Sequence, residues 1–151
     1  MLHIRPMRAE DEALVTDMMR VFYASPAVLS NGSAEIFHRD IQACVSDSPY
    51  AQGFVFEQES AAAGYGMLAL SYSTEFGRPC VWIEDLYVLP AFRGQGIGAA
   101  FINFVRTSHP EAVVRLEVER DNLRAQAFYR RCGLEELPYM EMIAQPGKSI
   151  I

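Results

Sequence analysis

Several residue types and patterns are scarce in this sequence of 151 residues, and each absence excludes a class of protein. The three cysteines and three histidines are scattered without a CxxC pair or a Cys/His cluster, which argues against a zinc site and a disulfide scaffold. Positive charge is not in excess: the formal net charge of −6 argues against nucleic acid as the main partner. No window approaches the roughly 18 apolar residues of a membrane span, and charges from Arg5 onward exclude a signal-peptide core. We expect a soluble, cytoplasmic protein without a metal, membrane or nucleic-acid partner.

What is present indicates a single globular domain over residues 1–151. Half of the residues are hydrophobic, and no repeat or low-complexity linker divides the chain. The apolar periodicity predicts strands and helices in an order typical of a mixed α/β layer structure. The expected strands cover residues 2–7, 53–58, 61–74, 79–89 and 112–119, with one or two more in the tail around 139–145; the expected helices cover 9–25, 33–47, 96–108 and 122–132, the last capped by Gly133.

The segment RGQGIG, residues 93–98, carries the strongest local signal. Its three glycines stand where a strand gives way to a helix, so the backbone can turn tightly and a ligand can approach closely. The free N–H groups of the first helical turn favour an anion, and Arg93 adds a permanent positive charge. A diphosphate would fit here. The alternative is a glycine-rich turn that only packs the helix against the sheet.

Two other phosphate-binding motifs were compared with this segment. Gly94, Gly96 and Ala99 satisfy the dinucleotide fingerprint G-x-G-x-x-G/A, and Glu119 follows at a suitable distance. Five residues, 89–93, separate the strand from the glycines, however, and too little chain remains after Glu119 for a run of βαβ units. A Walker loop is excluded because no G-K-[ST] follows. Nicotinamide-dinucleotide binding is therefore the minor alternative.

Two ordered motifs resemble the GNAT superfamily of acyl-CoA-dependent N-acetyltransferases. EDLYVLPAFRGQGIG is similar to its pyrophosphate-binding motif, and NLRAQAFYRRCGL is similar to its second motif; together the resemblance covers residues 80–135. Within the superfamily, IEDLYV resembles the diamine and polyamine acetyltransferases. The resemblance implies an α/β fold with a central mixed, mostly antiparallel sheet of six or seven strands and about four flanking helices. It also implies a splayed parallel strand pair, here 81–88 and 112–118, and a homodimer as the family default.

The same resemblance implies acetyl-CoA as cosubstrate and assigns residues to it. Backbone groups on the first splayed strand would pair with pantetheine and polarise the acetyl carbonyl, the amides of the glycine loop would hold the diphosphate, and Asn122 would contact the cofactor arm. Tyr129 would face the sulfur as general acid; its spacing of seven from Asn122 places both on one helix face. A core tyrosine is the alternative for Tyr129. The expected cofactor-binding residues are Leu86, Tyr87, Val88, Arg93, Gly94, Gln95, Gly96, Ile97, Gly98, Ala99 and Asn122.

Acetyl transfer to an amine also needs a base. An alkylamine of pKa ~10.4 is protonated at neutral pH, and neutralising it costs about 4–5 kcal/mol. Glu84 is the candidate because strand alternation places it on one face with Trp82, Leu86 and Val88, where burial would raise its pKa; a water relay is the alternative. By the same alternation Asp85 lies on the other face and is expected to be structural.

The expected reaction is direct transfer of the acetyl group to a primary amine within a ternary complex. A small molecule such as a polyamine is the first choice of acceptor, from the strand motif and the acidic charge balance. The superfamily places the acceptor site beside residues 16–45, but no recognisable pattern stands there. An amino acid, an antibiotic or a protein amine is the alternative acceptor, and a non-catalytic acetyl-CoA-binding module is the alternative of another class.

Overall fold

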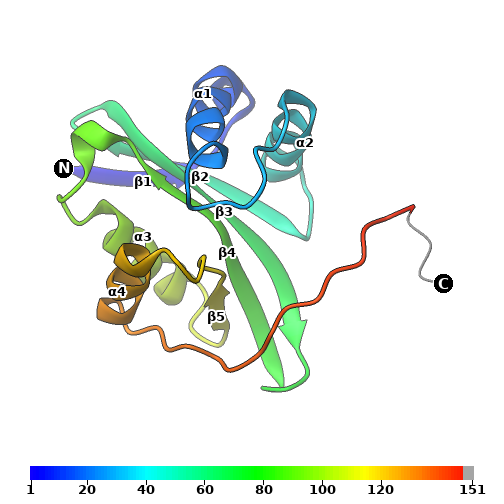
Figure 1. The fold of residues 1–151 in the computed structure, drawn as a ribbon. Coiled ribbons are helices and arrows are strands. Elements are labelled where there is room, and N and C mark those ends of the chain that lie inside the picture. The colour runs from blue at the N-terminus through cyan, green and yellow to red at the C-terminus, as the bar shows by residue number, and fades with distance from the viewer. Residues whose placement is uncertain (148–151) are drawn as a thin grey trace.

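A computed structural model of the chain describes residues 1–147 and shows one twisted sheet with helices on both faces (Figure 1). Five strands of this part of the chain lie in the order β1-β2-β3-β4-β5, antiparallel throughout except for the parallel pair β4 and β5. The strands are β1 Leu2–Pro6, β2 Ala51–Gln58, β3 Ala61–Ser73, β4 Arg78–Val88 and β5 Val113–Leu116. The helices are α1 Glu12–Tyr23, α2 Ala34–Val45, α3 Ile97–Ser108 and α4 Leu123–Arg131, with 3-10 turns at Ala9–Asp11 and Pro90–Phe92.

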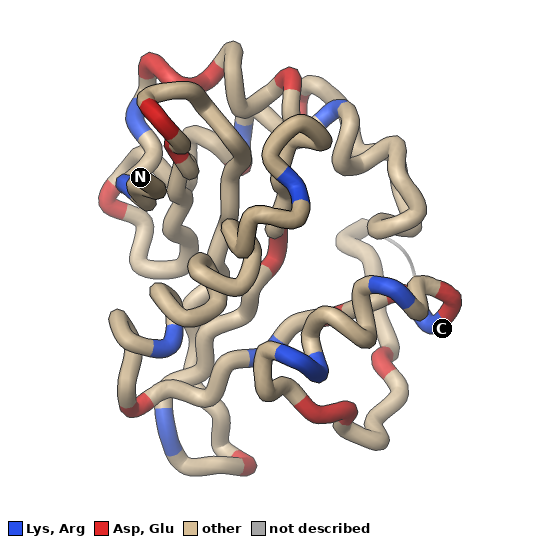
Figure 2. Tube along the Cα trace, turned by 90° about the vertical axis from the view of Figure 1, so that its left-hand side faces the viewer, with Lys and Arg blue, Asp and Glu red and all other residues tan. Residues whose placement is uncertain are grey.

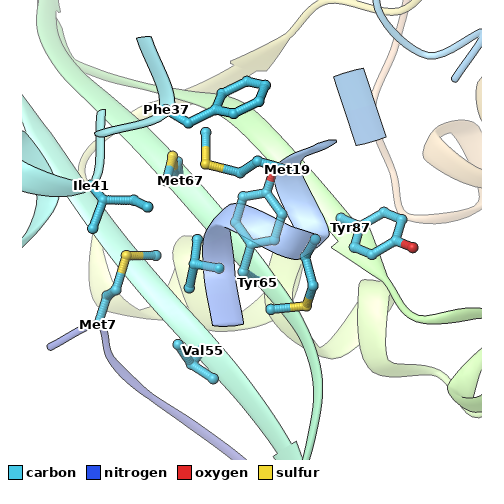
Figure 3. Packing of buried hydrophobic residues seen from close by; sticks show 10 residues of the cluster. Met7, Met19, Phe37, Ile41, Val55, Tyr65, Met67 and Tyr87 are labelled. Carbon is cyan, nitrogen blue, oxygen red and sulfur yellow. The ribbon is translucent and has the colours of Figure 1, made fainter. Parts of the chain in front are cut away.

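The helices α1 and α2 cover one face of the sheet. Each carries an apolar stripe at helical spacing, and α2 begins where the Ser33 side chain accepts a hydrogen bond from the Ile36 N–H. Figure 3 shows Met19 of α1 and Phe37 and Ile41 of α2 packed on Tyr65 and neighbouring side chains of the sheet. Each such side chain, when fully buried, stabilises the fold by about 1.5–3 kcal/mol.

The opposite face packs against α3 and α4. Phe101, Ile102 and Val105 of α3 are fully buried against the sheet, and Phe128 and Tyr129 of α4 join the edge of the same cluster. Leu86 and Val88 from β4 and Leu116 from β5 also belong to it. The sheet thus separates two apolar layers, one under α1 and α2 and one under α3 and α4.

The strand β4 contains a bulge that changes which side chains share a face. Opposite β3, Met67 pairs with Asp85 but the next residue, Leu68, pairs with Ile83, so Glu84 is an extra residue in the ladder. The parallel pairing with β5 ends at the same place, with Ile83 opposite Leu116. Residues 84–88 therefore have β3 on one side and no paired strand on the other. The expected splayed parallel pair is confirmed.

The predicted tail strand is wrong, and the expected sheet of six or seven strands has five in the described chain. Residues 137–145 form no regular structure and run away from the body of the protein (Figure 1). The edge strand β5 is four residues long and offers little backbone to pair with, and Pro138 has no N–H to donate. The apolar side chains that produced the prediction stay exposed: Met140 by 81% and Met142 by 91%. No helix in residues 1–147 has the length and apolar character needed to cross a membrane.

Candidate active site

The loop after β4 leads into the N-terminus of α3. Gly94 and Gly96 adopt left-handed conformations, with φ of +78° and +79°, and an added Cβ at either would meet no atom within 4 Å. The first backbone bond of α3 runs from the Ala100 N–H to the Gly96 carbonyl, so the preceding amides of Ile97, Gly98 and Ala99 have no partner within the helix. No acidic side chain occupies the first turn. Open space, free amides and the helix dipole together fit an anionic ligand.

The third glycine has a different role. A Cβ on Gly98 would lie 3.0 Å from Cζ of Phe128, so this glycine lets α4 pack closely on α3. Close packing thus explains a glycine at position 98, whereas it does not explain Gly94 and Gly96, which face open space. The three positions that looked alike in the sequence serve two purposes.

Arg93 folds back onto β4. Its Nε donates a hydrogen bond of 2.8 Å to the Val88 carbonyl, and its guanidinium carbon lies 5.6 Å from the centre of the Tyr87 ring. The side chain therefore fixes the glycine loop to the end of the strand. Its remaining N–H groups keep a positive charge next to the loop.

The backbone of β4 presents a free edge beyond the bulge. The Leu89 N–H donates to the Ala63 carbonyl at 2.8 Å, which sets the phase of the β3–β4 ladder. Because hydrogen-bonded and non-bonded pairs alternate, Tyr87 exchanges its backbone bonds with β3, while the backbone groups of Leu86 and Val88 point toward the gap. Of the three residues expected to offer backbone groups there, this geometry favours Leu86 and Val88.

The helix α4 presents Asn122 and Tyr129. The Asn122 side-chain oxygen caps the helix by accepting from the Ala125 N–H at 3.2 Å, which leaves its NH₂ group for other partners. Tyr129 is half-buried, and burial raises the pKa of its phenol, so the hydroxyl stays protonated at neutral pH. Within residues 1–147 this hydroxyl makes no hydrogen bond, and no buried side-chain polar atom is left unpaired, so it reaches solvent. This is not the satisfied hydroxyl of a core tyrosine.

A cavity of about 280 Å³ opens on the α1 and α2 side of the sheet, next to the bulge. Glu84 and Asp85 both line it, although strand alternation predicted opposite faces. The prediction is wrong because the extra residue at the bulge shifts the alternation by one, which brings two consecutive carboxylates to the same side. The cavity is lined by Tyr23, Asp40, Ala43, Cys44, Ala51, Met67, Leu68, Ala69, Glu84 and Asp85.

Asp85 is the most deeply placed acid of this cavity, with 2% of its surface exposed. Its two oxygens accept hydrogen bonds from the hydroxyls of Tyr23 at 2.9 Å and Tyr65 at 2.7 Å. Burial raises the pKa of Asp85 to about 6, in spite of the two hydrogen bonds, which lower it. The pKa values of both phenols rise as well, chiefly through burial and then through the charge of Asp85. Sequence reasoning missed Tyr65 and treated Asp85 as structural, since no local pattern marks a bulge.

Further carboxylates lie near Glu84. Partial desolvation raises the pKa of Glu84, and the charges of Glu141 and Asp40 raise it further. The neighbouring carboxyl group of Glu141 in the tail is the main reason that the pKa of Glu117 rises to about 7. Figure 2 shows acidic and basic positions interspersed along the chain, whereas the described lining of the cavity has three acidic residues and no basic one. Within the described residues, no group of three or more acidic, histidine or cysteine side chains could hold a metal ion.

Comparisons with known proteins agree with this geometry. The model of the acetyltransferase (GNAT) family matches residues 15–134. The chain is 38% identical over 87 residues to thialysine N-epsilon-acetyltransferases of Bos taurus and Mus musculus, which covers 56% of this chain and 51% of each relative. The chain thus spans about half the length of the curated relatives that it matches.

Solved structures share the fold over nearly the whole chain. A possible acetyltransferase from Clostridium difficile 630 superimposes with a TM-score of 0.82 at 19% identity, covering 95% of this chain and 97% of the other. An aminoglycoside N-acetyltransferase in complex with CoA superimposes with a TM-score of 0.79 at 16% identity, covering 97% and 95%. Since the family model spans most of the chain, and the glycine loop, the splayed strands and the second motif all lie within it, this protein belongs to the GNAT acetyltransferase family.

Proposed function

We propose that this protein transfers the acetyl group of acetyl-CoA directly to a small primary amine. The observation that carries the proposal is the position of the free β4 edge. Residues 84–88 lie between an anion-binding loop on one side and an acidic cavity on the other, at the point where β4 and β5 separate. An anionic cosubstrate and a cationic acceptor would meet there from opposite directions.

The residues present fit acetyl-CoA. The open space above Gly94 and Gly96 and the free amides of Ile97 to Ala99 would hold the diphosphate, with Gln95 in the same turn and the Arg93 charge beside it. The backbone groups of Leu86 and the N–H of Val88 would pair with pantetheine in the way that a further strand would, while the Val88 carbonyl already accepts from Arg93. Asn122 keeps an NH₂ group for the cofactor arm. Acetyl-CoA supplies the acetyl group as a thioester.

The acidic cavity supports a small, positively charged acceptor, the class that includes polyamines and basic amino acids. Glu84 would take the proton from the ammonium group, because its pKa is raised and its exposed side chain can pass that proton to water. Asp85, held by two phenols, would orient the ammonium group and offset its charge. The cavity of about 280 Å³ suits a small molecule better than a protein segment.

Tyr129 would donate its hydroxyl proton toward the departing thiolate. A phenol of pKa near 10 is a weaker acid than a thiol near 8.5, so full proton transfer is uphill by about 2 kcal/mol in water. A hydrogen bond to the developing negative charge is therefore the main contribution expected of this group. The solvent-reaching, unpartnered hydroxyl favours this role over a purely structural one.

Amine-dependent release of the CoA thiol tests the proposal. The purified protein is incubated with acetyl-CoA and a panel that contains a polyamine, a basic amino acid, an aminoglycoside and a peptide, and products are identified by mass spectrometry. Acetylation of a small amine, with loss of turnover in Glu84→Gln, is the expected result. Binding of acetyl-CoA without turnover of any amine would instead favour a non-catalytic module.

A further inference from the structure

A second cavity, of about 250 Å³, lies at the hairpin end of β3 and β4. Its lining includes Ser71, Thr74, Glu75, Trp82 and Arg115. Trp82 and Arg115 are register partners in the parallel pair of β4 and β5. The carboxylate of Glu75, the one acidic group in this lining, accepts a hydrogen bond from the Tyr139 hydroxyl of the tail.

Arg115 is held in this cavity without a carboxylate partner. Its guanidinium carbon lies 4.6 Å from the centre of the Trp82 ring, and the residue is half-buried. No acid of residues 1–147 forms an ion pair with it, although acidic residues outnumber basic ones in the chain. Arg5, by contrast, is bonded to both Asp11 and Glu57. Stacking on an indole fixes the plane of the guanidinium and leaves its N–H fork free for a planar anion.

The two cavities lie on the same face of the sheet. Ala69 lines the acidic cavity and Ser71 lines the cavity of Arg115, and residues two apart on a strand share a face. Two residues of strand span about 7 Å. The register continues this face to Trp82 and Arg115, because Ala69 pairs with Trp82 across β3 and β4. One small molecule could therefore place an ammonium group at Glu84 and an anionic group at Arg115.

We infer that Arg115 binds a carboxylate of the acceptor. The inference rests on the proposed function and narrows it: the acceptor is an amino acid or related molecule whose primary ammonium group and carboxylate are far enough apart to reach Glu84 on β4 and Arg115 on the adjacent strand β5. A guanidinium pairs with a carboxylate in a bidentate manner, which fixes orientation as well as position. Arg115 is thus a specificity-determining residue that separates carboxylated amines from polyamines.

The test compares lysine with cadaverine, which has the same chain and terminal amine but no carboxylate. The expected kcat/KM for lysine exceeds that for cadaverine by at least tenfold, and Arg115→Gln removes this preference by lowering kcat/KM for lysine while leaving that for cadaverine within twofold. Arg78→Gln is the matched control, because Arg78 is exposed on the neighbouring strand β4 and does not line the cavity, and it should keep the preference. Equal kcat/KM values in the unmodified protein, or an unchanged preference in Arg115→Gln, would overturn the inference.

Calorimetric titration with lysine separates this inference from the proposed function. If no amine of the panel is acetylated, the proposed function fails, and lysine binding that Arg115→Gln weakens tenfold still supports the subsite. Equal lysine binding by the unmodified protein and by Arg115→Gln overturns the inference of a carboxylate subsite. If Arg115→Gln does not fold, as judged by its melting temperature, Arg115→Lys replaces it. That variant keeps the charge without the planar fork, and an unchanged lysine preference in it likewise counts against the subsite.

Discussion

Asp11 and Asp85 are both buried aspartates, but within the described residues only Asp11 has a positively charged partner. Asp11 accepts two hydrogen bonds from the Arg5 guanidinium, at 2.8 and 2.9 Å, and one from the Arg8 N–H at 2.8 Å. Asp85 accepts its bonds from two tyrosine hydroxyls and has no cation beside it. The bond to Arg5 is the main reason that the pKa of Asp11 is lowered, whereas burial raises the pKa of Asp85 to about 6.

This difference indicates that Asp11 stabilises the fold, whereas we propose that Asp85 binds a ligand. The Arg5 network, which also includes Glu57, joins β1 to β2 and to the turn before α1, far from the acidic cavity. In this network the Arg5 guanidinium lies directly against both carboxylates. Asp85 keeps an uncompensated negative charge at the wall of a cavity, and a buried charge without a counter-ion costs stability unless something cationic arrives. Under the proposed function, the ammonium group of the acceptor supplies this positive charge.

Replacing Asp11 should have the largest effect on stability. Asp11→Ala removes the chief partner of Arg5 and is expected to lower the free energy of unfolding by about 3 kcal/mol, since an arginine at 13% exposure loses its bidentate acceptor. Denaturant unfolding measures the change. Turnover per folded molecule should stay the same. A comparable loss of activity in folded protein would mean that this network is not purely structural.

Replacing Asp85 should lower activity strongly and stability only slightly. Asp85→Asn keeps the shape but removes the charge, and kcat/KM for the amine should fall by one to two orders of magnitude, about 1.4–2.8 kcal/mol. Steady-state kinetics at saturating acetyl-CoA measure this. Stability should change far less than in Asp11→Ala. A variant with full activity would remove Asp85 from the acceptor site.

The hydroxyl of Tyr129, unlike those of Tyr23 and Tyr65, has no carboxylate partner among residues 1–147. Tyr129→Phe should lower kcat by tenfold or more, about 1.4 kcal/mol, and leave the affinity for acetyl-CoA nearly unchanged. Tyr50→Phe, an exposed phenol that lines neither cavity, serves as the control for loss of a hydroxyl. Equal turnover in Tyr129→Phe and the unmodified protein would exclude this residue from the mechanism.

The smallest effect expected is a difference in the pH dependence of stability. The folded pKa of Asp11 is lowered, so its contribution is present above the unfolded pKa near 3.9 and is lost as the pH falls through the folded value. The folded pKa of Asp85 is raised to about 6, so the folded state holds this proton more tightly and stability falls as the pH rises from about 4 to 6.

Denaturant unfolding at pH 4, 5, 6 and 7 would isolate the contribution of Asp85 by subtraction. The stability difference between Asp85→Asn and the unmodified protein should shift in favour of the variant across this range, because only the unmodified protein ionises a buried acid. A difference that is flat with pH would show that Asp85 titrates normally.

The sequence supported the fold well where local patterns are sufficient. Helical stripes, the break between strands 53–58 and 61–74 and the glycine loop each depend on neighbouring residues, and the helices and the first five strands lie close to their predicted places. The bulge at Glu84 could not be predicted, because it is a register shift between β3 and β4 that no single strand encodes. Its consequence, Asp85 and Glu84 in one cavity, was therefore missed. The prediction of a tail strand was wrong for a related reason. The alternation of apolar residues in the tail indicates a strand, but a strand there would have to pair with the short edge strand β5.

The most direct test of the account is calorimetric titration with acetyl-CoA and, separately, with NADH. The unmodified protein should bind acetyl-CoA with micromolar affinity, one molecule per chain, and NADH not at all. Gly96→Ala should weaken acetyl-CoA binding at least tenfold. Gly77→Ala, at another left-handed and sterically open glycine, should bind as the unmodified protein does. Binding of NADH alone, or no binding of either ligand by folded protein, would contradict the assignment of the glycine loop and with it the proposed function.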